Sequence, residues 1–240
     1  MPNAFIDKIR SYVPLTPDDV DLLTAACGNV RNVPARHDLI REGDKPGAVF
    51  VMLEGWACRY KILPEGGRQI VAFLIPGDFC DMHVAVLDEM DHSIATLTPA
   101  RIALIPQADI EALIDTRPSI TKAFWRTQLV DEGVLRAWIV SMGRRDALQR
   151  VAHLLCELYV RLRVIGHAKD GQCQIPLTQI VLADALGLTP VHVNRVLRRL
   201  REANAISTEG GKMVIANADQ LANIAGFDDN YLHRKLRRVA

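Results

Sequence analysis

The chain has 240 residues, of which 49% are hydrophobic and 24% are charged, and its formal net charge is +1. This composition supplies enough apolar surface for one or two folded domains and excludes an intrinsically disordered chain. No apolar run approaches the ~20 residues of a membrane-spanning helix, and the N-terminus lacks the pattern of a signal peptide. The sequence therefore predicts a soluble cytoplasmic protein.

The charges are distributed unevenly between the two ends of the chain. Residues 144–240 contain 15 Lys and Arg against 9 Asp and Glu, whereas residues 1–143 contain 14 against 19. A basic C-terminal part joined to an acidic N-terminal part indicates that only the C-terminal part faces phosphate groups.

The cysteines give little support for a metal centre. Five occur at scattered positions and no two form a C-x-x-C pair, which argues against a zinc or iron–sulfur site. We expect reduced and mostly buried thiols at Cys27, Cys58, Cys80, Cys156 and Cys173.

The N-terminal half changes from a helical to a strand-rich pattern. Residues 5–30 indicate short amphipathic helices, divided near Pro14 and Pro17. From about Val33 the chain consists of short apolar runs separated by glycine-containing turns, and these runs predict strands at 38–40, 48–53, 57–63, 69–75, 93–97 and 101–105. Their regular spacing is typical of an antiparallel barrel or sandwich, and a helix is expected to begin near residue 109.

A long helix is predicted from about Ser119 to Met142, because this stretch contains no proline and repeats apolar residues at helical spacing. About 24 residues span ~36 Å in a helix. The helix is apolar over more of its circumference than one barrel covers, so we expect it to pair with the same helix of a second chain. The predicted dimer contacts are Phe124, Val134 and Trp138, and burial within a single chain is the alternative.

Residues 177–200 indicate two short helices joined by a tight turn, after a hinge at 143–146 and a helix at 147–164. Thr178 and Thr189 are placed to cap the two helices, and Pro190 suits the first turn of the second. Gly187 suits a left-handed turn between them. This pattern predicts a helix-turn-helix whose second helix, at 189–201, enters the DNA major groove. An ordinary helical hairpin with a basic surface is the alternative.

The segment after the second helix favours the DNA-binding interpretation. Residues 206–208 and 213–215 are β-rich and enclose Gly210-Gly211, which is typical of a short β-hairpin. A hairpin directly after the second helix predicts a winged helix.

These elements, in this order, resemble the Crp/Fnr family of bacterial transcription regulators over nearly the whole chain. The resemblance is carried by GLTPVHVNRVLRRL in the C-terminal part and by REGDKPGAVFVMLEG and PGDFCDMH in the N-terminal part. It implies an α+β fold: an antiparallel β-roll (double-stranded β-helix-like) sensor domain at 1–117, a long dimerisation helix with hinge at 118–145, and a winged helix-turn-helix domain at 146–240. It also implies a homodimer that binds a two-fold operator in double-stranded DNA and acts through RNA polymerase.

The resemblance also suggests which residues contact DNA. Family members that read the operator with a Glu and an Arg on the recognition helix have them at positions that match Val191 and Arg195 here. Arg195 is able to contact guanine O6 and N7, whereas Val191 offers no acceptor and packs at most on a thymine methyl. His192 and Asn194 are the other base-contact candidates. The predicted phosphate contacts are Thr178, Gln179, Thr189, Arg198, Arg199 and Lys212, and a solvated helix face is the alternative for Arg198 and Arg199.

The resemblance is weaker in the effector region. Cyclic-AMP-binding members have a Gly-Glu pair and then an Arg-Ser pair that holds the cyclic phosphate, and the matching residues here are Gly77-Asp78 and His92-Ser93. The guanidinium is missing, and Asp88, Glu89 and Asp91 add negative charge nearby. We therefore expect weak or absent cyclic AMP binding and an unidentified effector.

The sequence matches neither of two sensor chemistries known in the family completely. The oxygen-sensing branch uses an N-terminal cysteine cluster, but no cysteine precedes Cys27. The carbon-monoxide-sensing branch binds haem through a Cys and a His two residues apart, together with an N-terminal proline. Cys80, His83 and Pro2 are similar, but the Cys and His are three residues apart. A haem-dependent or other redox-sensing regulator is therefore the alternative function, and structural roles for Cys80 and His83 are favoured.

Two further function classes are disfavoured by the sequence. An effector-binding signalling module with DNA as a secondary ligand is disfavoured by the basic winged helix. An enzyme using His83, His92 and Asp88 as acid–base groups lacks the spacing of a nucleophile–base pair or a metal site. The sequence thus predicts a DNA-binding regulator that is not an enzyme.

Overall fold

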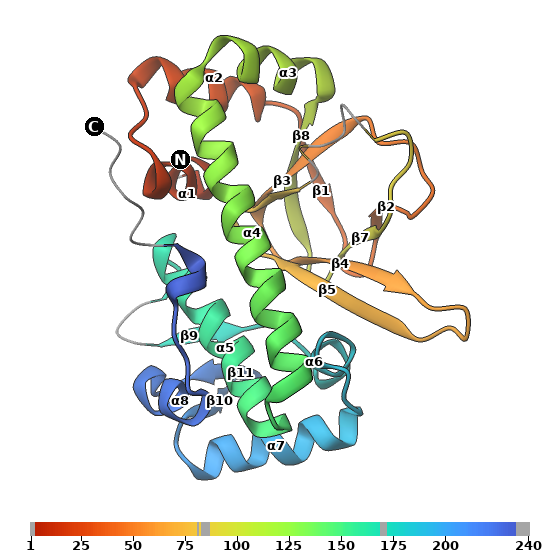
Figure 1. The fold of residues 1–240 in the computed structure, drawn as a ribbon, viewed down its shortest axis with the longest axis vertical. Coiled ribbons are helices and arrows are strands. Elements are labelled where there is room, and N and C mark those ends of the chain that lie inside the picture. Colours follow the sequence, from red (N-terminus) through yellow and green to blue (C-terminus); the bar gives the residue numbers. More distant parts are fainter. Residues whose placement is uncertain (1–2, 81, 83–86, 169–171, 234–240) are drawn as a thin grey trace. The chain divides into compact units, whose positions relative to one another are not determined.

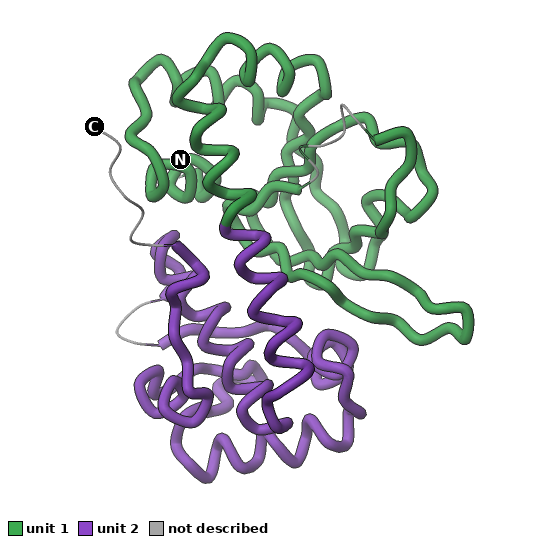
Figure 2. The backbone as a smooth tube through the Cα atoms, viewed as in Figure 1, with its two compact units in different colours: residues 1–129 green, residues 130–240 purple. Residues whose placement is uncertain are grey.

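The computed structural model describes residues 3–80, 82, 87–168 and 172–233. The chain divides into two compact units, unit 1 (Met1–Leu129) and unit 2 (Val130–Ala240) (Figure 2). The division falls within the long helix α4 (Pro118–Arg144), so that each unit contains about half of this helix. The element order is labelled in Figure 1.

Unit 1 contains an antiparallel β-roll made of two four-stranded sheets. The first has the strand order β1-β8-β3-β6, and the second has the order β2-β7-β4-β5. The strands are β1 (Val30–Val33), β2 (Asp38–Ile40), β3 (Ala48–Glu54), β4 (Ala57–Ile62), β5 (Arg68–Leu74), β6 (Phe79–Cys80), β7 (Ser93–Thr96) and β8 (Ala100–Pro106). The roll predicted from the sequence is confirmed, and β1 and β6 are two short strands that the apolar pattern did not indicate.

Alternate side chains of strand β3 belong to two different hydrophobic clusters. Phe50 and Met52 belong to a cluster with Ile94 from the second sheet, whereas Val49 and Val51 belong to a cluster formed with helices. Because successive side chains of a strand point to opposite faces, the first sheet is buried on both sides. These helices are α1 (Ala4–Tyr12), α2 (Pro17–Ala26), α3 (Gln107–Thr116) and the first half of α4.

The start of α2 is specified by its own sequence. The Thr16 hydroxyl accepts a hydrogen bond from the Asp19 backbone N–H at 3.1 Å, and the Asp19 carboxylate accepts one from the Thr16 N–H at 3.1 Å. Pro17 occupies the first helical turn, where its missing N–H costs no hydrogen bond. Asp19 also accepts a hydrogen bond from Ser119 of α4 at 2.8 Å, which joins the two helices.

Unit 2 contains the second half of α4 and a winged helix-turn-helix. Its helices are α5 (Ala147–Val164), α6 (Gln179–Leu186), α7 (Pro190–Glu202), α8 (Ala218–Ala225) and the short 3₁₀ helix η2 (Asn230–Leu232). A three-stranded sheet has the order β10-β11-β9, with β9 (Cys173–Ile175), β10 (Ile206–Glu209) and β11 (Lys212–Ile215). The predicted winged helix is confirmed, and β9 adds a strand to the expected hairpin.

Within the described residues, no single helix is long and apolar enough to cross a membrane; α6 and α7 meet the length and composition requirements only when taken together, and they are bent by 106°.

Candidate nucleic-acid interface

Helices α6 and α7 form the helix-turn-helix, and each of its local signals has the expected role. The Thr178 hydroxyl accepts a hydrogen bond from the Val181 N–H at 3.3 Å, and the Thr189 hydroxyl accepts one from the His192 N–H at 3.2 Å. Gly187 ends α6 with φ of +61°, in the left-handed region that glycine adopts without a Cβ penalty. The chain therefore turns by 106° between the two helices, within the range typical of this motif.

Helix α7 separates an apolar inner face from a polar outer face. Val193, Val196, Leu197 and Leu200 are buried. The four base-contact candidates, Val191, His192, Asn194 and Arg195, are all exposed, as are Arg198 and Arg199. At 100° per residue these six side chains cover one side of the helix. The sequence thus presents a single continuous surface with one Val, one His, one Asn and one Arg in the first half of the helix.

The phosphate-contact candidates lie at exposed helix and strand ends. Thr178, Thr189 and Lys212 are exposed, and Gln179 is half-buried. Lys212 begins β11 and pairs with Glu209 across the turn of the wing. Arg198 lies 3.6 Å from Glu202 in an exposed i,i+4 ion pair, so a contact with phosphate would exchange this weak pair for a stronger one. The phosphate contacts stay predictions.

The wing is built on two glycines with positive φ. Gly210 and Gly211 have φ of +55° and +78°, as a two-residue turn with the twist of a β-hairpin requires. Ser207 pairs with Val214 and Thr208 with Met213 across the hairpin. The turn projects beyond the paired strands, where the exposed Lys212 is available to an anion.

Arg150 supports the helix-turn-helix and was not identified from the sequence. Its guanidinium donates hydrogen bonds to the carbonyl oxygen of Leu186 at 2.8 Å, of Met142 at 3.0 Å and of Arg145 at 3.3 Å. These carbonyls lie at or just beyond the C-terminal ends of α6 and α4, where helix backbones have unpaired acceptors and partial negative charge. One side chain of α5 thereby joins the end of α4 to the turn of the motif.

The long helix α4 exposes a different apolar face from the one chosen from its sequence. Phe124, Val134 and Trp138, predicted as dimer contacts, are 1%, 7% and 8% exposed in the single chain. The exposed apolar side chains of α4 are instead Trp125, Leu129, Leu135, Ile139, Val140 and Met142. The choice of dimer contacts is corrected accordingly, because intrachain packing already covers Phe124, Val134 and Trp138. Within this set, Trp125 and Leu129 are four residues apart, as are Leu135 and Ile139, while six residues separate Leu129 from Leu135. Apolar pairs at this spacing are typical of a helix that pairs with another helix.

Comparison with known families gives two matches that together cover most of the chain. Residues 30–117 match the family model of the cyclic nucleotide-binding domain, and residues 149–224 match that of the Crp-like helix-turn-helix domain. The nitrogen fixation regulation protein FixK of Bradyrhizobium diazoefficiens is 28% identical over 184 residues, which cover 77% of this chain and 76% of FixK. The transcriptional activator protein anr of Pseudomonas aeruginosa is 24% identical over 212 residues, 88% of this chain and 86% of anr.

A solved structure shows the same fold. FixK2 from Bradyrhizobium japonicum superposes with a TM-score of 0.73 at 22% sequence identity, covering 83% of this chain and 98% of FixK2. The chain belongs to the Crp/Fnr family of transcription regulators. As a Crp/Fnr regulator it carries its DNA-binding function in the helix-turn-helix of unit 2.

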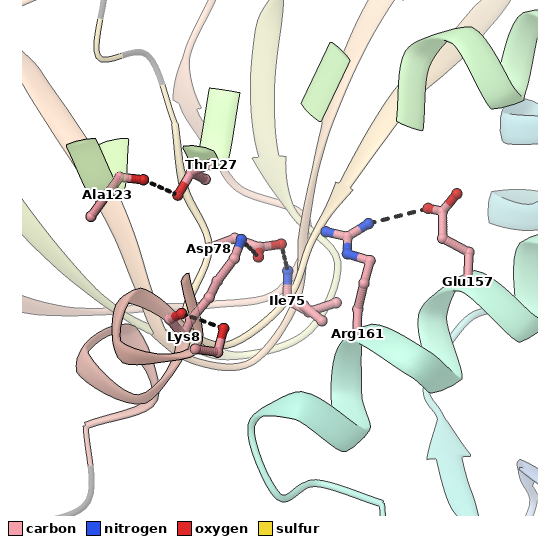
Figure 3. A network of polar contacts seen from close by, with 8 residues as sticks. Lys8, Ile75, Asp78, Ala123, Thr127, Glu157 and Arg161 are labelled. Atoms are coloured by element: carbon pink, nitrogen blue, oxygen red, sulfur yellow. Dashed lines mark hydrogen bonds and ion pairs between the residues drawn. The ribbon is translucent and has the colours of Figure 1, made fainter. Parts of the chain in front are cut away.

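In this Crp/Fnr regulator, Gly77 and Asp78 are packed against the first helix. A Cβ at Gly77, whose φ is +87°, would lie 2.5 Å from the carbonyl oxygen of Ala4. The Asp78 carboxylate is 2.6 Å from the Lys8 ammonium and accepts a hydrogen bond from the Ile75 N–H at 2.8 Å (Figure 3). Asp78 therefore has strong intrachain contacts that hold α1 against the turn between β5 and β6.

The other two effector-pocket candidates have separate partners. Ser93 accepts a hydrogen bond from the Glu42 N–H at 2.9 Å, and His92 lies 2.6 Å from the Asp91 carboxylate. Ser93 pairs with Tyr60 on β4, whereas the end of β5 before Gly77 pairs with Ala57, so the strand register places the two pairs toward opposite ends of β4. As an effector pocket, Gly77, Asp78, His92 and Ser93 remain a prediction.

The alternative haem ligands are only partly described. The Cys80 thiol is buried and donates a hydrogen bond to the Phe50 carbonyl oxygen at 3.5 Å, and Pro2 and His83 lie outside the described residues. Burial raises the pKa values of the Cys27 and Cys173 thiols to about 11 and that of the Cys156 thiol to about 12. These three thiols are thus protonated at neutral pH, which is typical of structural cysteines.

Proposed function

We propose that this Crp/Fnr regulator works as a homodimer that reads a two-fold operator with the exposed face of α7. The observation that carries this proposal is that Val191, His192, Asn194 and Arg195 are exposed together at the start of a helix whose opposite face is fully packed. Recognition helices of this motif contact bases with their N-terminal residues. The relatives are named as regulators, and we propose no enzymatic activity.

Arg195 is proposed to form hydrogen bonds with a guanine base. Its planar guanidinium donates two parallel hydrogen bonds, which match the O6 and N7 acceptors that guanine presents in the major groove. Asn194 and His192 are proposed for neighbouring base edges, and Val191 for a thymine methyl group. Thr178, Gln179, Thr189, Arg198, Arg199 and Lys212 are proposed as phosphate contacts that set the register of the protein on the duplex.

The dimer is proposed to form through the exposed face of α4. Trp125 and Ile139 are 74% and 72% exposed, and exposure of large apolar side chains along a helix is costly unless another surface covers them. A symmetric pair of helices places two copies of α7 on the same side of the assembly, as a palindromic operator requires.

The remaining parts of the proposal concern regulation. We propose that residues 1–117 sense an effector, residues 118–145 form the dimer helix and hinge, and residues 146–240 bind DNA. Weak or absent cyclic AMP binding is proposed, because no arginine occupies the position of His92 and Asp78 is engaged by Lys8. RNA polymerase is the proposed protein partner, and the cytoplasm, where bacterial operators lie, is the proposed compartment.

The test is selection of binding sites from random duplex DNA with purified, ligand-free protein. We expect an enriched palindrome with two half-sites about one helical turn apart. Arg195→Ala is expected to flatten the preference at one base pair of each half-site, at a cost of about 1–3 kcal/mol. The matched control is Arg198→Ala on the same face, which should weaken binding to all sequences alike and lower the salt dependence by about one phosphate contact. A folded dimer that enriches no sequence would contradict the proposal.

A further inference from the structure

The C-terminal segment, defined here as residues 227–233, has no role in the function described so far. It follows α8 and lies beyond residue 224, where the match to the Crp-like helix-turn-helix domain ends. It nevertheless contains a buried leucine, Leu232, which is 3% exposed, and a tyrosine that contacts two helices. The segment and the residues of α4 and α5 that it contacts all belong to unit 2.

The segment packs on α5 through aromatic rings. The ring of His153 stacks on that of Tyr231 with a centroid distance of 5.7 Å and an interplanar angle of 17°, and it meets the ring of Phe227 edge-on at 5.0 Å. His153 is 2% exposed, so these two rings are part of what covers it. The hydroxyl of Tyr231 donates a hydrogen bond to the Glu157 carboxylate at 3.1 Å, one turn further along α5.

The same segment also packs on α4. Gly133 lies in the middle of α4, where glycine is less favourable than alanine because it leaves the unfolded backbone more freedom. A Cβ at this position would overlap the carbonyl oxygen of Tyr231. The close approach of η2 to α4 is therefore the physical reason for a glycine inside this helix.

Glu157 joins the three elements. Its carboxylate is fully buried and accepts hydrogen bonds from Trp138 of α4 at 3.1 Å, from Tyr231 at 3.1 Å and from Arg161 of α5 at 3.3 Å (Figure 3 shows the Arg161 contact). A buried carboxylate is tolerated only when its oxygens are well paired. If the segment leaves, Glu157 loses one of these three donors, so the docking of the segment and the packing of α5 on α4 stabilise each other.

We propose that the C-terminal segment locks α5 onto residues 130–144 of α4, and that Tyr231 is a positioning residue for operator binding. Helix α5 holds the helix-turn-helix through the hydrogen bond from Arg150 to the Leu186 carbonyl. An orientation fixed between α4 and α5 therefore fixes where α7 lies relative to the dimer helix. The inference rests on the proposed dimeric operator binding and assigns it a geometric determinant outside the recognition helix.

The first test is a double-mutant cycle between Gly133 and Tyr231 in the full chain. Gly133→Ala alone is expected to lower the thermal midpoint by roughly 5 °C, because the new methyl group displaces the segment. In the Tyr231→Ala background the same change should cost little or raise the midpoint, since alanine is the better helix former once the segment is no longer held. Additive effects of the two substitutions would overturn the proposed contact.

The second test separates positioning from simple stability. Operators in which the two half-sites are moved apart by one base pair rotate one half-site by ~36° relative to the other. We expect the unchanged protein to bind such operators about tenfold more weakly, a loss equivalent to one mismatched base pair. Tyr231→Ala should reduce this ratio to about two, and Tyr231→Phe, which keeps the stacked ring and removes the hydroxyl, should give an intermediate ratio.

The control is Tyr12→Ala, which truncates a half-buried tyrosine of unit 1 and leaves the segment intact. It is expected to lower the thermal midpoint while the spacing ratio stays near tenfold. If Tyr231→Ala keeps the full ratio while binding the operator, the positioning role is overturned. If the unchanged protein selects no palindrome, the proposed function itself fails, and the thermal cycle still decides whether the segment is docked.

Discussion

The ammonium of Lys8 lies 2.6 Å from the carboxylate of Asp78, and both side chains are buried inside unit 1. Lys8 belongs to α1 and Asp78 to the turn between β5 and β6, so this pair attaches the first helix to the β-roll. Opposite charges removed from water stabilise a fold only while both partners remain in place.

Lys8→Met is therefore expected to destabilise the protein by about 3 kcal/mol, because it leaves a buried carboxylate without its cation. Replacing both residues, as in Lys8→Met with Asp78→Asn, should recover most of this loss, since no uncompensated charge remains. Urea unfolding followed by tryptophan fluorescence measures both values. Equal losses for the single and the double variant would show that the charges are not coupled.

The sequence predicted the helix-turn-helix well because its signals are local. Thr178, Gly187, Thr189 and Pro190 each act on backbone groups within a few residues, so the caps and the turn follow from residue type and spacing alone. The alternation of Val49, Phe50, Val51 and Met52 on β3 is equally local, although β3 proved to be buried on both faces.

The sequence was a poor guide where contacts between distant parts of the chain determine which side chains are buried and which residues pair. Helix α4 carries apolar residues around much of its circumference, so periodicity did not distinguish the buried Phe124 and Trp138 from the exposed Trp125 and Ile139. The partner of Asp78 lies 70 residues away and that of Tyr231 lies 74 residues away, so no spacing rule links them. Gly133 was the one available signal for the second contact, since an interior helical glycine indicates close packing.

His153 predicts a loss of stability in mild acid. Burial, together with the nearby positive charge of Arg145, lowers the pKa of His153 from 6.5 to about 4. Above pH 6.5 the imidazole is neutral in both the folded and the unfolded protein, so it has no effect. Between pH 6.5 and 4 the unfolded chain binds a proton that the folded protein does not, so the free energy of unfolding falls by on the order of 3 kcal/mol.

The measurement is the urea midpoint at several pH values between 7 and 4 for the natural chain and for His153→Phe. Phenylalanine keeps a ring between Phe227 and Tyr231 but takes no proton. The difference in urea midpoint between the two chains should therefore be constant above pH 6.5. Below pH 6.5 the natural chain should lose stability relative to His153→Phe. Burial raises the pKa of Glu157, although Arg161, Trp138 and Tyr231 act in the opposite sense, and both chains share this contribution. Parallel pH profiles below 6.5 would argue against a neutral, buried His153.

Ile139 is expected to be part of the dimer contact. Its side chain is 72% exposed on α4, and a glutamate there would place two like charges close together between paired helices. Ile139→Glu should therefore shift the protein toward monomer by at least tenfold in the dissociation constant, without changing the fold seen by circular dichroism. Sedimentation equilibrium measures the shift.

Ile62→Glu provides the matched control. Ile62 is 59% exposed and is the last residue of β4, so the substitution adds the same charge to unit 1 without changing α4. The control substitution should leave the dissociation constant unchanged. If both substitutions raise the dissociation constant equally, the cause is a general effect of charge rather than a contact along α4.

Val191 is expected to influence which base is preferred at one position of the half-site, because its side chain cannot form a hydrogen bond. It is 64% exposed in the first turn of α7, one turn before Arg195, and its side chain offers neither a donor nor an acceptor. Val191→Glu introduces an acceptor that pairs with the N4 amino group of cytosine. The selected half-site should therefore change at a single position in favour of cytosine, by about tenfold or 1.4 kcal/mol.

Val191→Ala is the control, because it removes apolar contact without adding an acceptor and should weaken any preference for thymine without creating one for cytosine. Selection of the same half-site by Val191→Glu and the natural chain would mean that this side chain does not reach the base edges, and that the register of α7 on the duplex differs from the one proposed.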